Sequence, residues 1–262
     1  MCLINSTVHD WVLPALYHSV HFQFSQDIVN FVSKHDVLNM RMRNRFKLIK
    51  DLHIGRGLNG MGDLLYGSRQ WPIHPLQQLI SLCTELRSLT VLYMDQRLWS
   101  LFEPFLPPRV DKITLGPMHG PINPQDLTQH PPLAYLTSVY TCLSDEEAEE
   151  LFNYPTMTKV RKFCEANSMG PAWAVNQAPL VTKSQSLQEY EIVICGAPDN
   201  TQPICLFAEQ SLKQMGATDR VVLHQAPSGG WVRILYDEFV ENRRRFIGML
   251  ASLTSSLIPR PY

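Results

Sequence analysis

An apolar pattern of the form L-x-x-L-x-L recurs along this chain, each time after a stretch with helical character. The last four instances begin at residues 86, 110, 133 and 157, in steps of 24, 23 and 24 residues. So constant a period is typical of a chain built from stacked units. The instances are Ile49-x-x-Leu52-x-Ile54, Leu86-x-x-Leu89-x-Val91, Val110-x-x-Ile113-x-Leu115, Leu133-x-x-Leu136 and Met157-x-x-Val160.

This period predicts an α/β fold, namely an irregular leucine-rich-repeat-like solenoid with a mostly parallel sheet and covering helices. Each short strand turns alternate residues inward, and the connecting segment covers the other side of the core. Because one unit cannot bury its own apolar face, we expect the units to stack. The predicted continuous core consists of Leu52, Ile54, Leu89, Val91, Ile113, Leu115 and Leu136.

We interpret residues 1–262 as a single repeat-like domain, regular over 1–165 and less regular over 166–262. A helix over 144–152 is marked by Ser144 as N-cap and by acidic residues in its first turn. We predict two further covering segments at 74–86 and 98–106, followed by a polar connection at 165–188. Two C-terminal strands are predicted at 191–195 and 220–224, and between them a helix at 203–216 that ends on Gly216. A final capping helix is predicted at 231–253.

Charge argues against binding to polyanions. With 23 basic and 24 acidic residues the formal net charge is −1, so no overall field attracts the chain to nucleic acid or to an anionic membrane surface. Basic runs at 41–47 and 243–245 are interpreted as solvated helix faces. We therefore predict no nucleic-acid partner and no membrane partner.

The compartment is predicted from cysteine usage and from the termini. The six cysteines stand singly in apolar stretches, which indicates buried thiols in a reducing environment. The N-terminus lacks the basic and apolar regions of a signal peptide, and no run approaches the roughly 18 apolar residues of a membrane span. A cytoplasmic or nuclear protein is expected.

One stretch resembles a known family. Trp11, Pro14, Leu16, Tyr17 and Val20 match a W-x-x-P-x-L-Y-x-x-V signature in which a helix enters the first strand, and the strand at 52–55 and the C-x-x-L-x-x-L motif from residue 83 match the next units. Together they resemble the body of fungal, particularly basidiomycete, F-box-type proteins over roughly residues 8–165. The resemblance implies the substrate-binding part of such a protein. Since only ten residues precede Trp11, no F-box and no binding to the adaptor Skp1 are expected.

An enzyme is the rival hypothesis. Gly55, Gly57 and Gly60 satisfy the G-x-G-x-x-G pattern of dinucleotide sites directly after a predicted strand. However, Asp95 lies about twice as far away as the usual acidic residue, and the intervening "GSRQWPIHP" interrupts the helix that a phosphate needs. A nucleotide-dependent enzyme using this loop, or a truncated paralogue without a selected partner, is kept as an alternative.

Other chemistry has no local support. The nine histidines form no H-E-x-x-H pattern, and the chain contains no G-x-S-x-G. We predict no catalytic residues, no cofactor and no metal site, and the preferred function is a non-catalytic scaffold for protein–protein interaction.

A candidate binding face follows from strand alternation, since residues next to the inward ones point to the opposite, open face. Tyr135 lies near the middle of this polar strip, and Tyr and Arg are frequent binding hot spots. Replacing Tyr135 and Arg161 together is expected to weaken binding to a partner by at least about 2 kcal/mol without changing the melting temperature. The predicted face consists of Asp51, His53, Ser88, Thr90, Lys112, Thr114, Tyr135, Thr137, Lys159 and Arg161.

Overall fold

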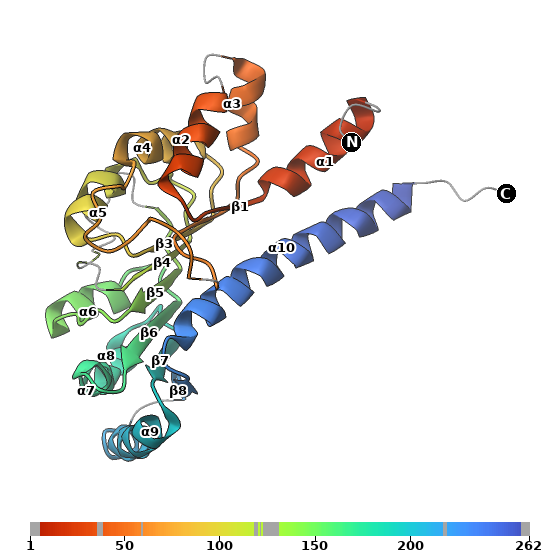
Figure 1. Cartoon of the computed structure of the whole chain (residues 1–262). Coiled ribbons are helices and arrows are strands. Elements are labelled where there is room, and N and C mark those ends of the chain that lie inside the picture. Colours follow the sequence, from red (N-terminus) through yellow and green to blue (C-terminus); the bar gives the residue numbers. More distant parts are fainter. Residues whose placement is uncertain are drawn as a thin grey trace.

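The computed structural model describes residues 6–35, 39–58, 60–117, 120, 122, 131–216 and 219–257, which form an α/β fold around a sheet of eight parallel strands. The strands lie in the sheet in the order in which they occur in the chain. Figure 1 shows them following one another from β1 to β8. Their bounds are β1 Ser19–Phe22, β2 Asp51–Ile54, β3 Ser88–Leu92, β4 Lys112–Gly116, β5 Tyr135–Val139, β6 Lys159–Glu165, β7 Glu189–Cys195 and β8 Val221–Ala226.

The strand register confirms the predicted core. Leu52 pairs with Leu89, Leu89 with Ile113, and Ile113 with Leu136, so the same position of the apolar pattern forms a row across neighbouring strands. All seven predicted core residues are at most 2% exposed and belong to one apolar cluster, the main core. The apolar period therefore sets both the position and the register of the central strands.

Helices that connect the strands cover one face of the sheet (Figure 1). Helix α6 begins at its predicted cap, where the Ser144 hydroxyl accepts a hydrogen bond from the Glu147 backbone N–H and the Glu147 carboxylate accepts one from the Ser144 backbone N–H. The helices on this side of the fold are α2 Ser25–Lys34, α4 Ile73–Leu82, α5 Gln96–Phe102 with the 3-10 turn η1 Glu103–Phe105, α6 Asp145–Phe152, α7 Gly170–Asn176, α8 Ala178–Lys183 and α9 Pro198–Gln214.

The segment 165–188 is not the long connection that its composition predicts, because it contains α7 and α8. Pro171 and Pro179 occupy the first turns of these helices, where proline costs no hydrogen bond. Ala174 and Val181 are buried against the sheet side of the fold. Prolines that indicate a break in the sequence therefore mark helix starts here.

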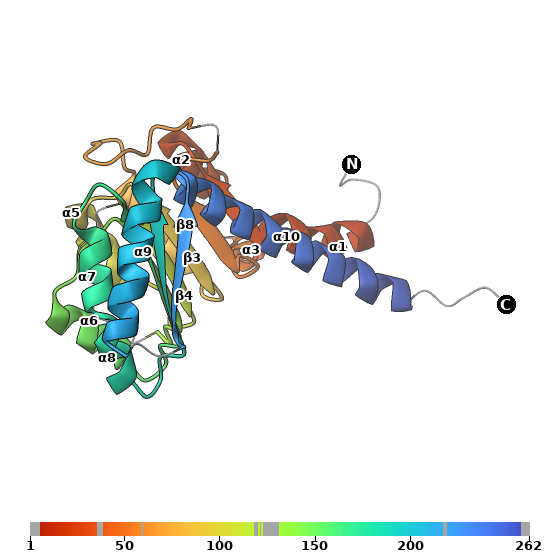
Figure 2. The same cartoon turned by 90° about the horizontal axis from the view of Figure 1, so that it is seen from below.

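Helix α10 (Gly230–Leu257) lies on the opposite face of the sheet, as Figures 1 and 2 show from two directions. The expectation that it caps the end of the stack is corrected, since it crosses the sheet instead. Its first two turns form a second apolar cluster with side chains near the carboxyl ends of the strands. That cluster contains Trp231 and Leu235 of α10 together with Leu92, Val139, Phe163, Val193, Cys195 and Ala226.

The far half of α10 reaches beyond the sheet. A helix of 28 residues is about 42 Å long, and in both views its C-terminal half passes beside α1 (Ser6–Tyr17) (Figures 1 and 2). Phe246 stacks there on His18, with ring centroids 3.6 Å apart. Of the helices that the structure describes, including this longest one, none is long and apolar enough to cross a membrane.

Candidate functional site: a groove beside helix α10

The ten residues of the predicted binding face lie on one face of the sheet, but α10 covers much of that face. Alternation turns the ten predicted residues away from the main core, toward the face on which α10 lies. Five of them, Asp51, His53, Thr90, Thr114 and Thr137, are buried. The expectation of an open face is wrong for these five, because the C-terminal helix packs across the sheet and not at its end.

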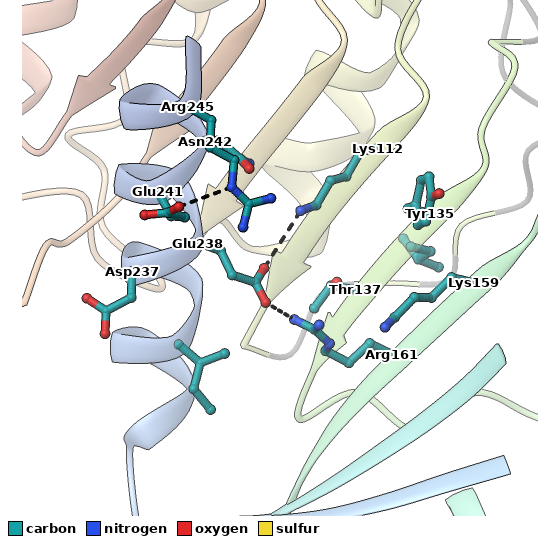
Figure 3. A pocket seen from close by; sticks show the side chains of 12 residues that line it. Lys112, Tyr135, Thr137, Lys159, Arg161, Asp237, Glu238, Glu241, Asn242 and Arg245 are labelled. Carbon is teal, nitrogen blue, oxygen red and sulfur yellow. Dashed lines mark hydrogen bonds and ion pairs between the residues drawn. The ribbon is translucent and has the colours of Figure 1, made fainter. Parts of the chain in front are cut away.

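The remaining exposure is concentrated at a groove between α10 and strands β4 to β6 (Figure 3). The groove has a volume of about 600 Å³. Its strand side carries Lys112, Tyr135, Lys159 and Arg161, and its helix side includes Glu238. Five predicted residues therefore line one cavity, these four and the buried Thr137, whereas Ser88 lies elsewhere on the face.

An ion-pair network forms the floor of this groove. Arg161 donates from Nε to Glu191 Oε2 at 2.7 Å and from Nη1 to Glu238 Oε1 at 2.6 Å, which ties β6 to both β7 and α10. Lys159 Nζ lies 2.8 Å from Glu191 Oε2 and 2.6 Å from Glu189 Oε1. Lys112 Nζ lies 3.7 Å from Glu238 Oε2. Figure 3 shows Glu238 reaching from the helix toward both Arg161 and Lys112.

Partial burial strengthens the central pair. The side chains of Arg161 and Glu191 are 14% and 10% exposed, so water screens them little. Burial alone would raise the pKa of Glu191, but hydrogen bonds from Lys159 and Arg161 and their positive charges outweigh it and hold that pKa below its usual value. Glu191 is therefore ionised at neutral pH, and the network has three cations facing three anions.

The acidic half of this network is missing from the sequence-based prediction. Glu189 and Glu191 alternate with Tyr190 along β7, so the rule that placed Arg161 on this face also places them there once the strand begins at 189. The position of Glu238 could not be predicted from strand alternation, because it depends on where α10 packs. The register pairs Arg161 directly with Glu191 across the two strands.

Histidines occupy the part of the face near β1 and β2. The rings of His21 and His53 lie 4.7 Å apart, edge to face, and His53 also contacts Phe239 of α10 at 5.3 Å between centroids. His53 is 1% exposed, and among the described residues neither of its ring nitrogens has a hydrogen-bond partner. Burial, followed by the effect of His21, lowers the pKa of His53 to about 3. Burial also lowers the pKa of His21, although its hydrogen bond with the Gly55 carbonyl acts in the opposite direction, so both histidines are held neutral beneath the helix.

We expect His53→Phe to change how stability depends on pH. Because the folded pKa of His53 lies below the unfolded value of 6.5, the unfolded chain binds more protons in acid, and wild-type stability is lost as the pH falls below 6.5. Phenylalanine does not titrate. The free-energy difference between variant and wild type, from urea unfolding, should shift in favour of the variant by about 2 kcal/mol between pH 7 and pH 5.

Comparing the variant with wild type separates the effect of His53 titration from that of the neighbouring Asp51. Burial raises the pKa of Asp51 to about 6, despite its hydrogen bond with Ser88 and the nearby Lys112, so Asp51 acts in the opposite direction over the same pH range. Both chains keep Asp51, and its contribution cancels in the difference. A difference that does not change with pH would mean that His53 is not buried in neutral form.

The glycine loop after β2 is used for packing. Gly55 has φ +139°, and a Cβ there would lie 2.7 Å from Cβ of Leu92, so only glycine permits the close approach to β3. Gly57 lies against the side chain of Gln23. A dinucleotide site has a helix N-terminus directly after such a loop, whereas the next helix, α4, begins at Ile73. Packing is a sufficient reason for Gly55 and Gly57.

Most of the described cysteines lie in the core. Four of the five described cysteines are buried as predicted, Cys142 is exposed, and Cys2 lies outside the described residues. Burial raises the pKa of the Cys164 thiol to about 12, which keeps it protonated. Within the described part of the chain, no group of three or more His, Cys, Asp or Glu side chains could hold a metal ion.

The stretch that carries the family resemblance forms the expected elements, a helix that ends at Tyr17 and a strand that begins at Ser19. Tyr17 Oη lies 2.6 Å from His35 Nε2, which links α1 to the end of α2. The side chain of Trp11 is outside the described residues. Compared with protein-family models, with curated proteins and with solved structures, the chain has no significant match to any of them.

Proposed function

We propose that this chain is a non-catalytic scaffold for protein–protein interaction, built as an irregular leucine-rich-repeat-like solenoid like the substrate-binding part of F-box proteins. The strictly sequential strand order supports the solenoid, because doubly wound sheets reverse their strand order at a switch point. The location of α2 and α4 to α9 on one face supports it as well, since solenoids keep their connecting helices on one side.

The groove beside α10 is the observation that carries the function. A cavity of about 600 Å³ opens between two secondary-structure layers, and Tyr135 stands at its edge with 45% of its surface exposed. Tyrosine contributes a large rigid contact area together with a hydroxyl group, which suits it to an interface. The charged side chains around it are already paired, so they favour a partner that matches their pattern over one of high net charge.

Tyr135 therefore marks the position for a contact test. A photo-crosslinking phenylalanine analogue placed at position 135 in native cells should capture a defined protein, while the same analogue at Leu206 on α9 should not. Leu206 is a matched control because it is also a half-exposed apolar residue, on the helix side of the fold. Capture of the same proteins from both positions would contradict a specific groove.

Once the partner has been identified, Tyr135→Ala should weaken binding to it by about 2 kcal/mol, or roughly thirtyfold, as loss of an interface hot spot does. Because the Tyr135 side chain is exposed, its replacement should hardly change the melting temperature. Titration calorimetry of wild type, Tyr135→Ala and Leu206→Ala measures this, and equal affinities would place the interface elsewhere. Arg161 is unsuited to the same test, because its ion pairs make any substitution affect folding.

A further inference from the structure

The main core is complete without α10. Among the described residues, the large apolar cluster draws its members from β1 to β7 and from the helices on the other face, and it includes no residue of α10. The helix follows β8 after a short turn that ends at Gly229, whose φ is +67°. It can therefore leave the sheet without breaking a strand or opening the main core.

Some polar side-chain atoms beneath α10 lack hydrogen-bond partners while the helix covers them. Among the described residues, both buried ring nitrogens of His53 lack a hydrogen-bond partner, and so does the buried Oδ2 of Asp51. Buried polar groups without partners destabilise the arrangement that buries them. In the described part of the chain, the ion pairs of Lys112 and Arg161 with the helix both go to Glu238. Covering this face with α10 is thus less favourable than its apolar contacts alone suggest.

The helix itself shows which ligand the face accepts. Trp231 contacts Tyr93 and Tyr140, with ring centroids 5.8 and 6.0 Å away. Phe239, two turns later, contacts His53, and Glu238 beside it meets Arg161. These anchors and Leu235 define an amphipathic helix with aromatic residues eight positions apart and an acidic residue directly before the second.

We propose that α10 is a displaceable occupant of the sheet face, and that the partner this face binds is a protein helix with the same pattern, which replaces α10. The inference rests on the proposed function, since it takes the face as a protein-binding surface. It extends the binding site from the groove to the covered residues, including Leu92, Val139 and Phe163, which would become accessible when the helix leaves.

A peptide exchange experiment on the full chain tests this. The probe is a labelled synthetic peptide of residues 230–247, and binding is followed by fluorescence anisotropy. The full-length variant Trp231→Ala/Phe239→Ala, which weakens the resident helix and leaves the face intact, should bind the peptide at least about tenfold more tightly than wild type, because its face is free more often. The matched variant Ile247→Ala/Met249→Ala, altered at two exposed positions on the same helix, should bind it like wild type.

Three results would overturn the proposal. One is equal affinity of the peptide for all three chains, and another is equal binding of a peptide that itself carries both alanines. The third is a wild-type dimer that exchanges α10 between copies, because the occupant would then be a second copy of this chain.

Hydrogen exchange on wild type keeps the proposal testable if the variant does not fold. Amides of α10 should exchange through a local opening that leaves β3 to β6 protected, and exchange only together with those strands would contradict a displaceable helix. Neither experiment needs the natural partner. If α10 proves to be fixed, the proposal of a binding groove still stands. If the crosslink at Tyr135 fails, the result of the peptide exchange experiment still stands.

Discussion

Replacing Leu89 with alanine is expected to lower the free energy of unfolding by about 2 to 5 kcal/mol, and Ile113→Ala should have a similar effect. Both side chains are fully buried and adjacent in the central row of the sheet. Each truncation removes apolar atoms from contact with both neighbouring strands and leaves a cavity that a rigid parallel sheet cannot close. Urea unfolding followed by circular dichroism measures the loss.

A surface leucine provides the control for this experiment. Leu101 on α5 is 54% exposed, so Leu101→Ala should change the unfolding free energy by no more than about 0.5 kcal/mol. Losses below about 1 kcal/mol at both Leu89 and Ile113 would show that the strands do not share one continuous core.

The part of the fold that the sequence predicts well is the part governed by local alternation. Leu52, Leu89, Ile113 and Leu136 recur at nearly the same interval because each must lie under its neighbour in the row, and the structure pairs them in that register. The same alternation places Arg161 on the opposite face, next to Glu191. A two-residue period determines the face of a side chain wherever the strand bounds are known.

What covers that opposite face could not be predicted in this way. The apolar residues Trp231, Leu235 and Phe239 recur every fourth position, which shows that α10 has an apolar side but not which surface it meets. Docking against the end of the stack and docking across the sheet bury the same stripe. The polar residues of the strands favoured an open face, and His53 beneath Phe239 shows how aromatic contacts override that preference.

The helices α7 and α8 were missed for a different reason. Pro171 and Pro179 are read as breakers when their position in a helix is unknown, although proline is well tolerated in a first turn. The small residues Ala174 and Ala178 are weak hydrophobic signals, yet both are fully buried. Close packing of a short helix on a sheet favours small side chains. The contrast in hydrophobicity between the buried and exposed sides of such a helix is then low, so its sequence pattern is weak.

The ion-pair network makes Arg161 the position where a surface-like substitution should cost most. Arg161→Met removes one close cation of the partly buried Glu191 and leaves Lys159, 2.8 Å away, as its remaining close partner. It also releases Glu238 of α10 from its closer ion pair. Removal of one partner from a buried pair costs about 3 to 5 kcal/mol when the other charge is left unpaired, so with Lys159 still in place the expected cost is about 2 kcal/mol. We expect a loss of that size at pH 7, whereas Arg245→Met, which breaks only the exposed pair with Glu241, should cost less than about 0.5 kcal/mol.

The pH dependence of this loss distinguishes weakened ion pairing from lost packing. The folded pKa of Glu191 is below its usual 4.5, so the stabilisation from its ion pairs is complete above that pH and is lost as the pH falls through the folded value. Once Glu191 is protonated it no longer needs Arg161. The difference between Arg161→Met and wild type should therefore shrink as the pH is lowered from 7 to below 4. A cost that stays constant over that range would mean that Arg161 stabilises the fold through its aliphatic stem, and the charges of the groove floor would then contribute little to holding α10 on the sheet.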